Sequence, residues 1–345
     1  MRNSYGFWRN DVKTVSAVIF GFIICLCSQA VAQMGYTGNS NFYGGETREW
    51  EFKSSVLVLD LKDSNLNQAV IANSNTAITI LNATQLSALD TGVGIDASLF
   101  KILNNDQRWE LRSTFASFNQ QFQVRGSAAG NLNDVFNPGF PPASVISFGG
   151  AGGQVRGAGA KENRLDYFGI ELNLHRAVAP GVSFTAGPKC VNVDDQFSVA
   201  TVRPNGGGGA TLFTADELKT SNRLFGGSVG FDLNLKAGRN LSFSGFFRAG
   251  YYANDSTFNR LRATNLTTVV TNNKIRETNG SGIGEFGGFV TYEVIPGTVS
   301  LEGGYHAIWV DNAARAFSQV FNAAGGVGTD TLFIQGIRFG LVYRR

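Results

Sequence analysis

The sequence predicts an all-β fold, a closed antiparallel transmembrane β-barrel of about ten strands, within a range of roughly eight to twelve. Three features predict it: an export signal at the amino terminus, long stretches in which apolar and polar residues alternate, and connections whose lengths alternate between short and long. No apolar run after residue 33 approaches the length of a membrane-spanning helix. Strands would therefore have to cross the membrane.

Residues 1–32 are predicted to be a secretory signal peptide. A basic region with Arg2 and Arg9 precedes an apolar core at 15–26, and Ala30-Val31-Ala32 provides the small residues that favour cleavage. The apolar core is shorter than the roughly 20 residues that a transmembrane helix needs. Cleavage before Gln33 is expected, with export through the Sec pathway.

Lipoprotein processing is the rival for this region, because Cys25 and Cys27 lie near the apolar core. Neither cysteine follows the small residue that such processing normally requires. The expected organisation is therefore a signal peptide at 1–32, a periplasmic segment at 33–48, and an outer-membrane barrel at 49–345.

Alternation with a period of two is clearest in residues 225–236. Phenylalanine, valine and leucine occupy one face there, whereas serine, aspartate, asparagine and lysine occupy the other, as expected of a strand between two different environments. The same pattern predicts ten strands, at 49–61, 91–103, 107–119, 164–176, 181–199, 222–236, 239–255, 281–294, 298–311 and 331–344.

The connections between these strands favour a membrane barrel. Tight links such as Ala237-Gly238 follow the even-numbered strands, whereas links of roughly 19 to 44 residues follow the odd-numbered ones, as short periplasmic turns and long extracellular loops do. A secreted soluble β-sandwich also alternates and remains the alternative. Aromatic residues are expected at the lipid headgroups, namely Tyr251, Tyr252, Tyr292, Tyr305, Trp309 and Tyr343.

Composition excludes several other classes of protein. After signal cleavage Cys190 is the only cysteine, so no intramolecular disulfide is possible, and the charges nearly balance, which gives no reason to expect nucleic acid. One cysteine and two histidines without ligand spacing predict no metal and no cofactor. The G-x-S-x-G pattern at 226–230 lies within an expected strand instead of a strand-to-helix turn, so no enzyme is predicted.

Six segments resemble β-barrel porins that are numerous in planctomycetes, and their order and spacing carry the resemblance. These segments are 50–61, 80–100, 165–195, 220–232, 303–320 and 335–343. The chain departs from the family pattern at Pro188-Lys189-Cys190, at Ala316 and at its end, Arg344-Arg345. The resemblance implies an outer-membrane barrel and, less specifically, a pore.

The expected inner face carries the charges, because charged residues that face lipid are costly. Arg108 and Lys189 are expected there, together with the predicted pore-lining residues Asp96, Glu110, Arg112, Glu171, His175, Asp232, Arg248, Glu285, Glu293, Glu302, His306 and Arg338.

Such charges have two interpretations. In a water-filled lumen they would select ions, whereas in a closed barrel they would pair across the lumen. The first predicts a narrow porin for passive diffusion of small hydrophilic solutes or ions. The second predicts a scaffold or adhesin that acts through long surface loops. Membrane lipid, the barrel-assembly machinery and small solutes are the partners expected.

Overall fold

The computed structural model describes twelve stretches of the chain. All of them lie in the second of the two units into which the chain divides, Thr47–Arg345. The expected signal peptide (1–32) and periplasmic segment (33–48) lie outside the described residues. The described stretches are 50–62, 69–73, 79–82, 91–104, 107–120, 132–134, 146–148, 157–203, 212–264, 268–316, 318–320 and 327–345.

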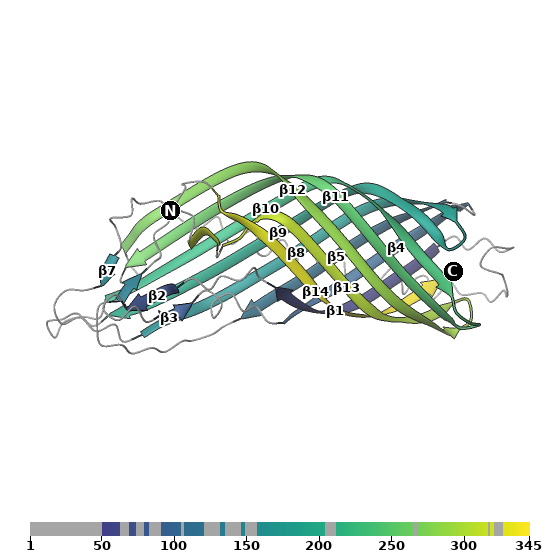
Figure 1. Ribbon diagram of the computed structural model, residues 1–345, viewed down its shortest axis with the longest axis horizontal. Helices are drawn as coiled ribbons and strands as arrows, with labels where there is room; N and C mark the ends of the chain where they lie inside the picture. Colours follow the sequence, from purple (N-terminus) through teal and green to yellow (C-terminus); the bar gives the residue numbers. More distant parts are fainter. Residues whose placement is uncertain are drawn as a thin grey trace. The chain divides into compact units, whose positions relative to one another are not determined.

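Ten antiparallel strands close into a barrel, which confirms the predicted fold class (Figure 1). Around the ring the order is β1-β14-β13-β12-β11-β10-β9-β8-β5-β4, and β1 pairs with both β14 and β4. The bounds are β1 Trp50–Lys62, β4 Gly92–Asn104, β5 Gln107–Gln120, β8 Gly157–Ala179, β9 Val182–Arg203, β10 Leu212–Lys236, β11 Leu241–Thr264, β12 Thr268–Ile295, β13 Val299–Ala314 and β14 Thr329–Arg344.

Four short strands form a second antiparallel sheet, in the order β3-β2-β6-β7. They belong to the connections that follow β1 and β5. Their bounds are β2 Ala69–Asn73, β3 Thr79–Asn82, β6 Leu132–Asp134 and β7 Ile146–Phe148. A single 3-10 turn, η1 (Ser318–Val320), follows β13. No helix in the described stretches is both long enough and apolar enough to span a membrane.

Tight turns gather at one end of the barrel, here called the turn end; the opposite end is the loop end. The β8–β9 turn contains Gly181 with a φ of 74°, and the β12–β13 turn contains Gly297 with a φ of 75°. Both φ values lie in the left-handed region that glycine tolerates best. At Gly181 a Cβ would also lie 2.4 Å from the carbonyl oxygen of Asn234.

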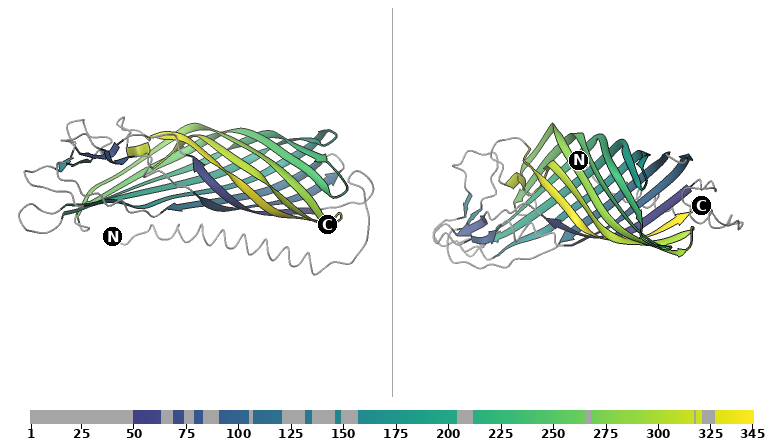
Figure 2. Two further views of the ribbon diagram at one scale, coloured as in Figure 1. Left: turned by 60° about the horizontal axis from the view of Figure 1, so that its bottom comes forward. Right: turned by 45° about the vertical axis from the view of Figure 1, so that its right-hand side comes forward.

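The strands fall into two sets of different length. β8–β12 contain 22 to 28 residues, whereas β13, β14, β1, β4 and β5 contain 13 to 16 (Figures 1 and 2). Two of the expected long loops are therefore wrong. Only residues 204–211 separate β9 from β10, and only 265–267 separate β11 from β12. The extra strand residues replace the loops expected at 200–221 and 256–280.

The exterior carries a continuous apolar belt at the turn end. On β10, Leu235, Leu233, Phe231, Val229 and Phe225 are exposed in succession. The same holds for leucine, isoleucine, valine and aromatic side chains on the other strands. Alternate residues are buried inside, and many of them are charged or polar, so the barrel is apolar outside and carries its charges within. This is the inverse of a soluble protein and is typical of a membrane-spanning barrel.

Polar residues mark the limit of the apolar belt on the loop-end side. Beyond Phe225 the next outward residue on β10 is Arg223, and beyond Trp309 the next on β13 is Asp311. Tyr251 is 73% exposed near this limit, in keeping with its expected place in an aromatic girdle. The same expectation for Tyr252 is wrong, because adjacent strand residues face opposite ways; Tyr252 is 1% exposed inside the barrel.

Candidate functional site: a layered lumen

Arg112 of β5 is at the centre of an ionic layer inside the barrel. Its guanidinium donates to Asp96 at 2.8 Å, to Glu171 at 3.0 Å and to Glu285 at 3.0 Å. Glu285 lies on β12, which is five strands away from β5 around the ten-stranded ring. This contact therefore joins opposite walls. The four side chains are at most 4% exposed.

Further cations bind neighbouring carboxylates in the same layer. Arg248 of β11 donates to Glu171 at 2.5 Å and to Glu110 at 3.0 Å. Lys189 of β9 donates to Glu285. Charge-assisted bonds of this kind offset the large cost of removing ions from water, and each carboxylate has at least one cationic partner.

The network continues on the β14 side of the layer. Arg338 lies 3.1 Å from Asp96 and 3.2 Å from Glu302, with both pairs almost fully buried. Three strands, β13, β14 and β4, are joined in this way. The ionic layer thus contacts most of the wall instead of one sector of it.

His175 of β8 bridges two carboxylates. Its Nε2 lies 2.9 Å from Glu110 and its Nδ1 lies 2.6 Å from Asp232. The imidazole thereby links β8 to Glu110 of β5 and to Asp232 of β10, and Thr185 lies 3.1 Å from its Nδ1. Among the described residues of the layer, six carboxylates face five Lys or Arg side chains and two histidines, His175 and His306.

Eleven of the twelve predicted pore-lining residues converge in this layer, and one does not. Asp232 lies 3.6 Å from Arg248, and His306 lies 3.4 Å from Arg112. Glu293 is close to the β12–β13 turn, where it accepts a hydrogen bond from the Gly297 N–H. The alternation of inward and outward residues on β12 is interrupted at this point, because its pairing with β13 shifts register between Glu293 and Ile295.

Phenylalanine rings lie on the turn-end side of the ionic layer. Phe246 is beneath two guanidinium groups, with its centroid 5.3 Å from Arg112 and 5.1 Å from Arg248. Phe289 stacks on Phe246 and lies 4.9 Å from Arg338. These distances allow cation–π attraction, so the rings both fill space and stabilise the buried cations.

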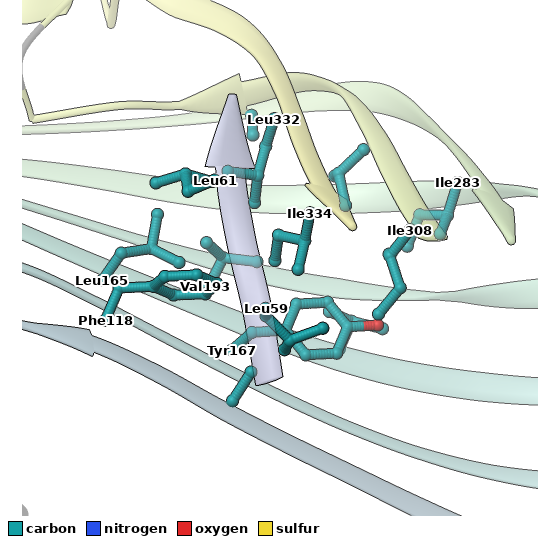
Figure 3. Close-up of a cluster of buried hydrophobic side chains, with 14 of the residues drawn as sticks. Leu59, Leu61, Phe118, Leu165, Tyr167, Val193, Ile283, Ile308, Leu332 and Ile334 are labelled. Atoms are coloured by element: carbon teal, nitrogen blue, oxygen red, sulfur yellow. The ribbon is translucent and has the colours of Figure 1, made fainter. Parts of the chain in front are cut away.

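A layer of apolar aliphatic and aromatic side chains fills the lumen on the loop-end side (Figure 3). Figure 3 shows side chains from β1, β5, β8, β9, β12, β13 and β14 directed toward one another. Each is at most 7% exposed, and together they leave the described interior apolar at this level. The layer comprises Leu57, Leu59, Leu61, Ala116, Phe118, Leu165, Tyr167, Val191, Val193, Leu224, Tyr252, Ile283, Ile308, Val310, Ala313, Leu332 and Ile334.

The end of β13 and the two residues after it turn inward across the loop-end side of this layer. Residues 312–316 are here called the mouth segment. Asn312 has a φ of 56°, a left-handed conformation that asparagine tolerates better than most residues. Arg315 then donates to Asp195 of β9 at 2.8 Å, four strands from β13 around the ring. The mouth segment therefore reaches the far wall.

Asn222 of β10 fixes the middle of the mouth segment. Its Oδ1 accepts the Ala314 N–H at 2.6 Å, and its Nδ2 donates to the Ala314 carbonyl at 2.8 Å. Thr220 donates to the same carbonyl at 2.9 Å. Sequence reasoning missed Asp195 and Asn222. Their signal is a polar residue at inward positions whose neighbours on that face, such as Val193 and Leu224, are apolar.

These layers constrain what the lumen can do. Phenylalanines, ion pairs, aliphatic side chains and the mouth segment follow one another from the turn end to the loop end. Within the described stretches, no group of three His, Cys, Asp or Glu side chains is arranged as metal ligands would be. Ser228 of the G-x-S-x-G pattern is 6% exposed and lies in mid-strand on β10.

Comparisons with known proteins give no family. No family model matches the chain, and none of the curated proteins does. The planctomycete porin resemblance therefore stays a prediction.

Among solved structures, the outer-membrane protease OmpT of Escherichia coli is 12% identical, with a TM-score of 0.35 and coverage of 86% of this chain and 94% of the other. The translocator domain of autotransporter NalP from Neisseria meningitidis is 9% identical, with a TM-score of 0.38 and coverage of 97% of this chain and 98% of the other. The toluene transporter TbuX of Ralstonia pickettii is 11% identical, with a TM-score of 0.35 and coverage of 87% of this chain and 90% of the other. At these values the likenesses carry no inference about activity.

Proposed function

We propose that this protein is an outer-membrane barrel with a closed lumen, and that it acts as a scaffold for the surface it presents at its loop end. The contact between Arg112 and Glu285 on opposite walls supports the closed lumen most directly. In a water-filled channel these charges would be hydrated and apart. Here both side chains are at most 4% exposed.

The outer-membrane location rests on the exterior. A belt of exposed apolar side chains surrounds strands whose backbone bonds are closed into a ring, and closure is what lipid demands of a sheet. Membrane lipid is then the partner of the belt, and the barrel-assembly machinery would insert it. Signal cleavage and Sec export belong to the same proposal.

The narrow porin is the competing candidate, because the residues predicted to line a pore do lie inside. A pore needs a path between them, and eight-stranded barrels are already filled by side chains whereas sixteen strands leave a channel. Ten strands with three filled layers favour the closed state. Covalent chemistry is likewise not part of the proposal, since Ser228 is buried in mid-strand.

Single-channel recording in a planar bilayer tests the proposal. Purified, refolded protein should give no discrete conductance steps above the bilayer background. A double variant, Arg112→Ser with Arg248→Ser, removes the two guanidiniums from the ionic layer and should give steps if that layer is the seal. Stable steps in the unmodified protein, with the same size in the double variant, would support the porin instead.

A further inference from the structure

We propose that the free edge of β12 at the loop end binds an extended acidic peptide of a partner protein, which adds to the wall as an antiparallel strand. This inference rests on the proposed surface role only in that the loop end must face outside the cell. The edge itself is a property of the strands, whether or not the lumen conducts.

The edge exists because β13 leaves β12. The two strands pair from the turn end as far as Ile283 and Val310, and β12 then continues to Thr268. Beyond Val310 the chain turns at Asn312 into the mouth segment instead of following β12. Over 268–282 the described residues place a strand on only one side of β12, namely β11.

Two side-chain hydrogen bonds show which backbone groups face the open side. The Gly280 carbonyl accepts a hydrogen bond from the Nδ2 of Asn312 and therefore points to the β13 side. The Glu277 carbonyl accepts a hydrogen bond from the hydroxyl of Ser256 and therefore points to the β11 side. Because these directions alternate along a strand, the N–H and C=O of Lys274, Arg276 and Thr278 point to the open side.

This edge lies beyond the apolar belt. The outward residues of β12 from 278 to 274 are polar or charged and exposed. On β11 beyond Tyr251, the half-buried polar residues Asp255, Thr257 and Asn259 face outward. An open edge could not persist in lipid, which offers no hydrogen bonds, whereas water tolerates one. The barrel is thus closed where it meets lipid and open only beyond it.

Exposed strand edges are templates for another chain, and β-strand addition is a common mode of peptide recognition. The side chains of this edge select the peptide. Lys274 and Arg276 face outward, and Lys274 has no carboxylate of the described residues as an ion-pair partner. Half-buried Ile275 faces inward. A strand with carboxylates on one face and apolar residues on the other complements both.

A second copy in the same membrane does not fit this edge. Barrels in one membrane have the same end outward, so their β12 strands would run in the same sense instead of antiparallel. Strands in such barrels are tilted by about 35–45°, so two facing β12 strands would cross at a large angle. A flexible peptide has neither constraint. Six residues of it would span about 20 Å of the edge.

Amide hydrogen exchange on the full barrel in detergent micelles tests the edge first. The amides of Lys274, Arg276 and Thr278 should exchange quickly, whereas those of Ile275, Glu277 and Asn279, which bond β11, should be at least tenfold slower. Equal protection of both sets would mean that this chain already covers the edge, and the proposal would fail.

The partner chemistry is tested with a fluorescent eight-residue peptide of alternating glutamate and valine. Binding should slow exchange at Arg276 and Thr278, and a version with alternate amides N-methylated should bind at least tenfold more weakly. Lys274→Glu should weaken binding about fivefold through a cross-strand repulsion. Lys219→Glu is the matched control, because β10 is paired with β9 and β11 on its two sides at this residue. This substitution should leave binding unchanged.

Two further results would overturn the proposal. Equal binding of the normal and N-methylated peptides would show that charge alone attracts the peptide, without strand addition. Failure of the peptide to bind when the edge amides exchange quickly would exclude an acidic strand as the partner. Neither result depends on conductance, so this inference and the closed lumen can fail separately.

Discussion

The five long strands and the five short ones share one membrane belt but end at different heights. On β13 the belt ends at Trp309, and the strand stops soon after, at Ala314. On β11 the belt ends near Tyr251, yet the strand continues to Thr264. The membrane therefore sets the level at which the outer surface changes but not the length of the strand. The extra length of β8–β12 needs a different reason, which a surface role supplies.

The ion pairs of the membrane-spanning part and of the extended part also differ, in their exposure to water and in their number of partners. Arg112 inside the barrel is 4% exposed and bonds three carboxylates, whereas Arg276 on the extended part is 70% exposed and bonds a single carboxylate of the described residues, Asp255. Removing one partner of a buried pair leaves an uncompensated charge, whereas exposed ions regain water. The two regions should therefore respond to substitution very differently.

The largest effect is expected for Arg112→Ala. Three buried carboxylates would lose a cation at once, so the free energy of unfolding should fall by about 3–5 kcal/mol. Reversible urea unfolding in micelles, followed by tryptophan fluorescence, measures this. A loss below 1 kcal/mol would mean that water reaches the layer and hydrates the carboxylates, as an open lumen would allow.

A substitution on the outer face should locate the edge of the belt. Val229→Arg introduces a cation where β10 is 55% exposed among apolar residues, and should cost about 2–4 kcal/mol if that site is near the bilayer midplane. Thr257→Arg faces outward on β11 beyond the belt and is the matched control. Urea unfolding in lipid vesicles should show a loss for the first only. Equal losses would place the membrane further toward the loop end.

Sequence patterns predicted the part of the barrel that meets lipid. Alternation of apolar and polar residues exists only where one face contacts lipid and the other does not, as in residues 225–236. Beyond the belt both faces contact water or polar neighbours. On β11 the residues from Ser256 to Arg262 are mostly polar on both faces, so the same criterion assigned them to a loop.

The inward charges were predictable for the same reason, but their partners were not. Alternation places Arg112 and Glu285 on inner faces, whereas their contact depends on which strands lie opposite in the closed ring. The mouth segment was beyond prediction because it departs from strand geometry at one residue, Asn312. The predicted strand ended at residue 311, next to that turn, but alternation does not indicate in which direction the chain continues.

An intermediate effect is expected for Asn222→Ala, which releases the mouth segment. The buried Ala314 N–H would lose its acceptor, and such a group costs about 1–3 kcal/mol. Exchange of the Ala314 amide should become faster, and urea unfolding should show the loss. Asn192→Ala is exposed on β9 and should change neither. Unaltered exchange at Ala314 in the Asn222 variant would mean that other contacts hold the segment.

The smallest effect is expected for Arg276→Ala. The guanidinium makes two hydrogen bonds to Asp255, at 2.7 and 2.6 Å, but it is exposed to water and ions. Both groups regain hydration when the pair is broken, so the urea midpoint should stay within the error of the unmodified protein. Asp255→Asn should behave alike, and the double variant should equal either single one. A clear shift of the midpoint would show that the extended wall is coupled to the closed part of the barrel. The comparison between an independently solvated wall and a buried, paired lumen would then no longer hold.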